Sequence, residues 1–276
     1  MLLLGAVADV LAGAVTGAIR RRDPWAVWSR LRSDLRHLMR ERDLASPTEL
    51  IGCALAVAAS TVAASAALGL AGGSLALILL GFAGAAAGAH VTLADPLTSA
   101  GRRRLAGARR DLVTVEIPFL LAIAVPFLRW HASDVAAIHG AHAVLGPAFV
   151  VGSATTVTGV ALGTAVLVVA GALRLPLSPG TEAGAHGGPG VASTVARWAL
   201  VGALGLAAGS FVVGRGLATA GFLPIEVAVL GAAAAISILV ATTWRVREAL
   251  SARARLVTGV ICAVTVSAAV VLVLSG

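Results

Sequence analysis

Eight apolar stretches, each close to the length of a membrane-spanning helix, occupy most of this chain of 276 residues. A helix needs about 20 mostly apolar residues to cross the hydrocarbon core of a bilayer. The stretches lie at roughly 2–19, 49–70, 74–94, 112–128, 144–173, 191–213, 221–243 and 256–275. Because 58% of the residues are hydrophobic and only 12% are charged, one soluble core could not bury them all. We predict an all-α polytopic membrane protein with a single integral membrane domain over residues 1–276, and exclude a soluble enzyme.

The arginines are distributed unevenly among the loops between these stretches. Eighteen of the 21 follow the first, third, fifth or seventh stretch, whereas the even-numbered loops hold only Arg129 and Arg215. Arginine-rich loops stay on the cytoplasmic side of a membrane. The alternation therefore predicts eight transmembrane helices in the cell membrane, with both termini outside the cytoplasm. The same rule explains the net charge of +8, and the chain has no basic–aromatic module of the kind that binds nucleic acid.

The first arginine-rich loop has the pattern of an amphipathic helix at about 24–42. Trp25, Trp28, Leu31 and Leu35 recur at helical spacing, and arginines and acids occupy the opposite face. Such a helix can lie along the cytoplasmic membrane surface or dock to a protein partner. Both interpretations remain open from the residues alone.

Glu116 is the ionisable residue that stands out within the apolar stretches, because it comes two residues before Pro118 in the fourth of them. A charged group at membrane depth is costly and therefore marks either an ion path or a contact between helices. With no cation beside it, this carboxyl could exchange protons; with a partner helix beside it, it would be structural. We expect Asp9 near the outer membrane interface, and Arg197 to extend toward the cytoplasmic headgroups.

Other polar groups have plainer interpretations. Asp95 and Asp111 flank an arginine cluster and fit ion pairs at the interface. The fourth loop carries His131, Asp134, His139 and His142, but their spacing gives no closed set of metal ligands. Gly84 and Gly88 are spaced for close helix packing. We find no catalytic motif and predict no metal site.

Three segments, residues 13–47, 93–123 and 242–274, resemble a known family. The first joins a helix to an arginine-rich amphipathic segment, the second leads from a glycine- and arginine-rich loop into a helix with an early glutamate, and the third is a final helix pair with a basic linker. Together they are similar to the NuoH-like membrane subunit of respiratory complex I. They are closer to its shorter eight-helix version in formate hydrogenlyase and other energy-converting, membrane-bound nickel–iron hydrogenases.

The resemblance implies a non-catalytic membrane anchor for a peripheral redox arm. Its partners would be hydrophilic hydrogenase-like or NuoB- and NuoD-like subunits, together with antiporter-like membrane subunits. Iron–sulfur clusters and a nickel–iron centre are expected in those partners, and no cofactor in this chain. The implied docking residues are Arg20, Arg21, Arg22, Arg102, Arg103, Arg104, Arg109 and Arg110. The implied proton-transfer residues are Glu116, Asp111, Asp95 and Glu182, the last being the one glutamate kept in a loop that is rich in glutamates in the family.

Two other classes of function were considered. A small-solute transporter or permease component would also be polytopic, but such folds often have internal repeats, and none is evident between the two halves of this chain. A lipid-modifying enzyme is disfavoured because no paired-carboxylate or nucleophile motif faces a membrane surface. A small-solute transporter or permease component is therefore the alternative to a membrane anchor subunit.

Overall fold

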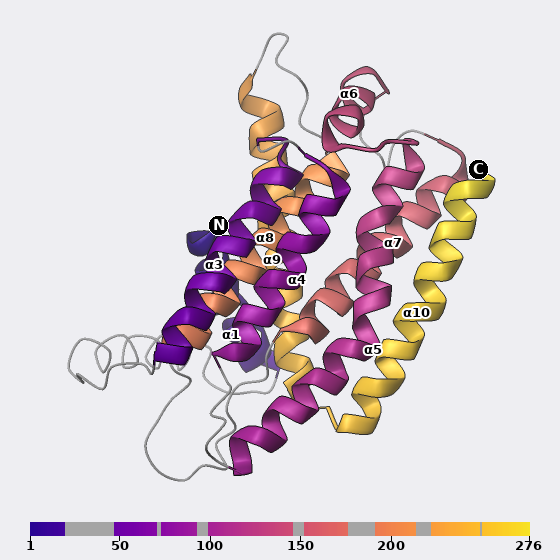
Figure 1. Cartoon of the computed structure of the whole chain (residues 1–276). Coiled ribbons are helices and arrows are strands. Elements are labelled where there is room, and N and C mark those ends of the chain that lie inside the picture. Colours follow the sequence, from indigo (N-terminus) through magenta and orange to yellow (C-terminus); the bar gives the residue numbers. More distant parts are fainter. Residues whose placement is uncertain are drawn as a thin grey trace.

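The computed structural model of the chain is built from helices packed side by side (Figure 1). It describes residues 1–19, 47–70, 73–92, 99–145, 152–175, 191–213, 222–248 and 250–276. Within these ranges the helices are α1 (Leu2–Ile19), α3 (Pro47–Ala67), α4 (Leu75–Val91), α5 (Ser99–Arg129), α6 (Val135–Leu145), α7 (Ala154–Arg174), α8 (Val191–Val213), α9 (Phe222–Glu248) and α10 (Ala252–Ser275). The predicted all-α class is therefore confirmed for the described residues.

Six of these helices are long and apolar enough to cross a membrane. Their spanning segments are Pro47–Ala67, Leu112–Arg129, Ala154–Arg174, Ala192–Val213, Ala228–Arg247 and Ala252–Ser275. Two shorter apolar helices, Leu2–Gly17 and Leu75–Val91, coincide with the first and third predicted stretches. The predicted amphipathic helix at about 24–42 lies outside the described residues.

Short polar side chains mark where several helices begin. Ser74, Ser153 and Ser251 each accept a hydrogen bond, 3.2 Å long, from the backbone N–H three residues later, at the starts of α4, α7 and α10. Asp134 does the same for α6, accepting from Ala137 at 2.8 Å. These caps satisfy backbone donors that have no partner within the helix.

Two predicted stretches differ from the observed helices. The fourth predicted span, 112–128, coincides with the spanning segment Leu112–Arg129, but the helix that contains it, α5, begins earlier, at Ser99, and carries the arginine cluster as a helical extension of the span. Arginine and alanine favour helix, so the end of the apolar stretch does not end the helix. The fifth stretch, 144–173, is divided between the end of α6 at Leu145 and α7, which begins at Ala154. Ser153, whose hydroxyl accepts from the backbone N–H of Thr156, caps the start of α7.

The helices form two neighbouring groups. One contains α5, α7 and α10, and the other contains α1, α3, α4, α8 and α9; α7 joins them by packing on α9 and α8, and α4 by packing on α5. In Figure 1 the first group stands on the right, and α6 covers the upper end of the bundle. At the lower end of the bundle in Figure 1, α7 ends and α8 begins. We refer to this end of the bundle as the loop end.

Small residues bring the helices close together. A Cβ atom on Gly88 would lie 2.5 Å from the backbone nitrogen of Ala56, and one on Gly5 would lie 2.0 Å from the carbonyl oxygen of Trp198. The predicted packing role of Gly88 is thereby confirmed; a Cβ on Gly84 would meet Ala59 at 3.2 Å. Such close backbone approach is typical of helices that associate inside membranes.

Candidate functional site

Glu116 of α5 forms an ion pair with Arg174, the last residue of α7. The Nη2 atom of Arg174 donates to Oε1 of Glu116 at 2.9 Å, and its Nε lies 2.9 Å from Oε2. One charge-assisted hydrogen bond and a second close nitrogen–oxygen approach thus join the guanidinium to the carboxylate. Proton exchange by Glu116 was expected only if no cation lies beside its carboxyl. Arg174 does lie beside it, so this condition is not met.

The surroundings of this pair are apolar on the arginine side. The guanidinium carbon of Arg174 lies 3.9 Å from the ring centroid of Phe119, and its Nη2 is 3.4 Å from the carbonyl oxygen of Phe82. Only 3% of the Arg174 side chain is exposed, compared with 28% of the Glu116 side chain. The carboxylate is thus held by a buried cation, while part of the Glu116 side chain remains accessible.

A second charged cluster joins α1, α8 and α9 around Asp9. Oδ2 of Asp9 accepts from Arg197 at 2.8 Å and from the indole N–H of Trp198 at 3.0 Å. Oδ1 accepts from Arg245 at 2.7 Å. We refer to Asp9, Arg197, Trp198, Trp244 and Arg245 as the Asp9 cluster; the ring centroid of Trp244 is 4.2 Å from the guanidinium carbon of Arg197.

The Asp9 cluster corrects one expectation and shows the partners of Asp9. Asp9 lies beside Arg197, six residues after the start of α8, and Arg245, three residues before the end of α9. Arg197 does not extend into the headgroups but turns inward and is 8% exposed. The gain from pairing with a buried carboxylate and from stacking on an indole explains the inward turn.

Arg247 is a third buried guanidinium, 2% exposed, at the same end of the bundle. Its Nη1 donates to the carbonyl oxygen of Ala172 at 3.2 Å and also to that of Leu175. The last carbonyls of a helix have no partner within it and carry partial negative charge. Arg247 of α9 therefore closes the C-terminus of α7, directly after the residue that pairs with Glu116.

The histidines predicted on the fourth loop lie at the opposite end, on and before α6. His139 is within 2.8 Å of Oγ of Ser210, and Trp130 donates to Nε2 of His142 at 3.0 Å. Asp134 is occupied as the cap of α6. Among the described residues no three histidine, cysteine, aspartate or glutamate side chains gather as a metal site would require.

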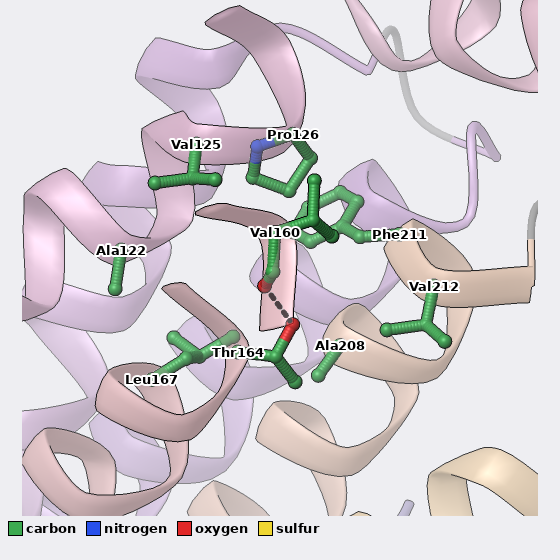
Figure 2. Close-up of a pocket in the computed structure, with 9 residues that line it drawn as sticks. All are labelled: Ala122, Val125, Pro126, Val160, Thr164, Leu167, Ala208, Phe211 and Val212. Carbon is green, nitrogen blue, oxygen red and sulfur yellow. Dashed lines mark hydrogen bonds between the residues drawn. The ribbon is translucent and has the colours of Figure 1, made fainter. Parts of the chain in front are cut away.

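A small apolar gap lies between α5, α7 and α8, beside Pro126 (Figure 2). The hydroxyl of Thr164 is directed to the carbonyl oxygen of Val160 in its own helix, 2.9 Å away, rather than into the gap. The space is about that of one water molecule, so it does not fit an organic substrate.

The fold of this chain matches that of a protein of known structure. A chain in the structure of the membrane-bound sulfane sulfur reductase, an archaeal respiratory membrane complex, matches it with a TM-score of 0.70 at 14% sequence identity. The match covers 97% of this chain and 95% of the other. This chain therefore has the fold of a subunit of a respiratory membrane complex. No family model matches its sequence, and no curated protein matches it either.

The remaining predicted site residues lie either on α5 or outside the described residues. Asp111, Arg102, Arg103, Arg104 and Arg109 lie on α5, but their side chains are outside the described part, while Arg110 is exposed. Asp95, Glu182, Arg20, Arg21 and Arg22 lie outside the described residues altogether. Glu116 stands out in the sequence, but its partner Arg174 and the cap Arg247 do not, because each follows an apolar stretch and looks like an ordinary loop charge.

Proposed function

We propose that this protein is a membrane-anchor subunit of a multi-subunit oxidoreductase of the hydrogenase or complex I type. The observation that carries the proposal is the fold match along nearly the whole chain to a chain of a respiratory membrane complex. The protein itself offers no cluster of metal ligands among its described residues, so electron transfer would take place in partner subunits.

The arginine-rich segments are the proposed docking surface for the peripheral redox arm. They comprise Arg20, Arg21 and Arg22 after the first helix and the arginines of α5 from Arg102 to Arg110. In this proposal the loop end faces the cytoplasm, the eight apolar helices other than α6 all cross the membrane, and both termini lie outside. The cation excess would then attract acidic surfaces of the arm.

The proposal also gives Glu116 a role in proton movement. Its carboxylate is partly accessible and is fixed by Arg174, so it can pass a proton only when that pair loosens. A change in a docked partner that draws Arg174 away would free the carboxylate to take up a proton. Such a step would form the start of a half-channel, with Asp111, Asp95 and Glu182 as further candidates.

Purification in a mild detergent tests the anchoring role. We expect iron–sulfur or nickel–iron subunits to co-purify with the tagged chain from its own membranes, and to be lost when Arg102, Arg103 and Arg104 are all changed to glutamine. A matched control changes Arg253 and Arg255, at the start of α10, to glutamine. Recovery of the chain without any redox subunit would contradict the anchor function.

Proton movement needs a separate experiment on the assembled complex in vesicles. Glu116→Gln is expected to lower proton translocation while leaving assembly and electron transfer intact, because glutamine keeps a hydrogen-bond acceptor for Arg174 but cannot ionise. Glu49→Gln makes the same chemical change in the first turn of α3 and should leave translocation unchanged. Normal translocation in Glu116→Gln would remove this residue from the path and leave the anchoring role standing.

A further inference from the structure

The Asp9 cluster contains more positive charge than its single carboxylate balances. Asp9 is shared by the guanidinium groups of Arg197 and Arg245, so the cluster has a net charge of +1. The Asp9 side chain is 9% exposed and that of Arg197 is 10% exposed. A cation held in such surroundings is stabilised when an anion supplies the missing charge.

Hydrogen-bond donors in the cluster are also unused. The carboxylate of Asp9 already accepts from Arg197, Trp198 and Arg245. The Nε atoms of Arg197 and Arg245 are both buried and have no hydrogen-bond partner among the described residues. Buried donors of this kind are normally satisfied, and the acceptor best suited to a guanidinium is a carboxylate or phosphate oxygen.

Arg245 provides the open side of the cluster. Its side chain is 25% exposed, more than twice the value for Arg197, and it lies three residues before the end of α9. The neighbouring Trp244 is 2% exposed and lies against both guanidiniums, 4.2 Å and 5.9 Å from their carbon atoms. The indole thus fixes the two cations while Arg245 remains reachable from outside.

The depth of Arg245 points to the source of the anion. The spanning segment of α9 is Ala228–Arg247, which places Arg245 within the last turn of the membrane-crossing part. Phospholipid phosphates lie at this boundary, and basic pockets between transmembrane helices are known to hold anionic headgroups. Trp198, a half-buried indole that donates to Asp9, is a residue type enriched at headgroup depth.

We propose that the Asp9 cluster is a binding site for a phosphate group, supplied by the headgroup of an anionic phospholipid. The phosphate binds at the guanidinium of Arg245, the more accessible of the two arginines, and neutralises the excess charge of the cluster. Asp9 holds the guanidiniums in place and also competes with the lipid for them. The site does not depend on the redox function proposed above.

The test measures lipid binding to the purified protein by native mass spectrometry. Phosphatidylglycerol is compared with zwitterionic phosphatidylcholine, and inorganic phosphate is added as a competitor. The wild type is expected to retain phosphatidylglycerol selectively, and Arg245→Gln to bind it about tenfold more weakly, the effect of losing one charge-assisted hydrogen bond. Arg253→Gln removes an exposed arginine on α10 and should bind as the wild type does.

The variant Asp9→Asn distinguishes a lipid-binding site from a cluster that only stabilises the fold. Removing the competing carboxylate frees both guanidiniums, so phosphatidylglycerol binding should become tighter, whereas loss of a structural ion pair alone would not increase it. Displacement of the lipid by millimolar phosphate would support the phosphate site and identify a free anion as a second ligand. Equal phosphatidylglycerol binding in the wild type, Arg245→Gln and Asp9→Asn would overturn the proposal.

Discussion

Arg174 and Glu116, which are 58 residues apart in the sequence, meet at the contact of α7 with α5 through two nitrogen–oxygen approaches of 2.9 Å. The pair sits where α7 ends, and Arg247 binds the last carbonyls of the same helix. Charged groups from α5, α7 and α9 therefore fix one point at the loop end of the bundle.

Replacing Arg174 by glutamine should destabilise the protein. The Glu116 carboxylate would then lie within a spanning segment without its cation. Breaking a fully buried ion pair costs at least roughly 3 kcal/mol of unfolding free energy, and because Glu116 is partly exposed we expect a loss no larger than that. Thermal unfolding in detergent measures the change. The double variant Arg174→Gln, Glu116→Gln should recover part of the loss, and strictly additive effects would show that the two side chains are not coupled.

Acid should loosen α6, which lies outside the six spanning segments. Burial, and next the nearby His139, lower the pKa of His142 from 6.5 to about 4. Since Trp130 donates to Nε2 of His142, a proton on that nitrogen breaks the bond. An undocked His142 takes up its proton more readily than the docked one, so docking is fully stable above about pH 6.5 and weakens as the pH falls from there toward about 4.

The fluorescence of Trp130, obtained as the difference between the wild type and Trp130→Phe, reports this transition. His142→Gln is the matched control, because its amide oxygen still accepts from Trp130 but cannot be protonated in this range. We expect a fluorescence change between pH 6.5 and 4 in the wild type and a flat profile in His142→Gln. The same acid transition in both proteins would assign it to another group.

Gly88→Ala should weaken the contact between α3 and α4. The added methyl would lie 2.5 Å from the backbone nitrogen of Ala56 and 2.7 Å from the carbonyl oxygen of Gly52, and backbone atoms cannot move aside independently. We expect a loss of about 1–3 kcal/mol in unfolding free energy, as for other overpacked sites. Gly231→Ala, where no described atom beyond the helix's own neighbouring residues lies within 4 Å of the new methyl, should be neutral or slightly stabilising.

Arg247→Leu should fray the end of α7. It removes the guanidinium that donates to the carbonyls of Ala172 and Leu175, and leaving buried carbonyls unsatisfied costs about 1–3 kcal/mol. Hydrogen–deuterium exchange of the last turn of α7 should become faster, with Arg253→Leu as the exposed control. Unchanged exchange in that turn would mean that Arg247 does not hold it.

Much of the architecture could be predicted from local patterns. The apolar stretches gave the helical class and the positions of most helices, although the fifth stretch is divided between α6 and α7. The start of α5 at Ser99 was missed because hydropathy indicates where a helix is apolar, not where its hydrogen bonding begins. The arginine cluster continues the helix without changing its backbone geometry.

By itself the sequence determined that this chain belongs in a membrane and where its apolar helices lie, because helix formation and lipid solubility depend on residues close together along the chain. The tertiary structure alone decided which charges meet. Asp9 finds partners 188 and 236 residues away, and Glu116 finds one 58 residues away. Such pairs depend on which helix faces share an interface, and that choice is made by the packing of the whole bundle rather than by any local pattern.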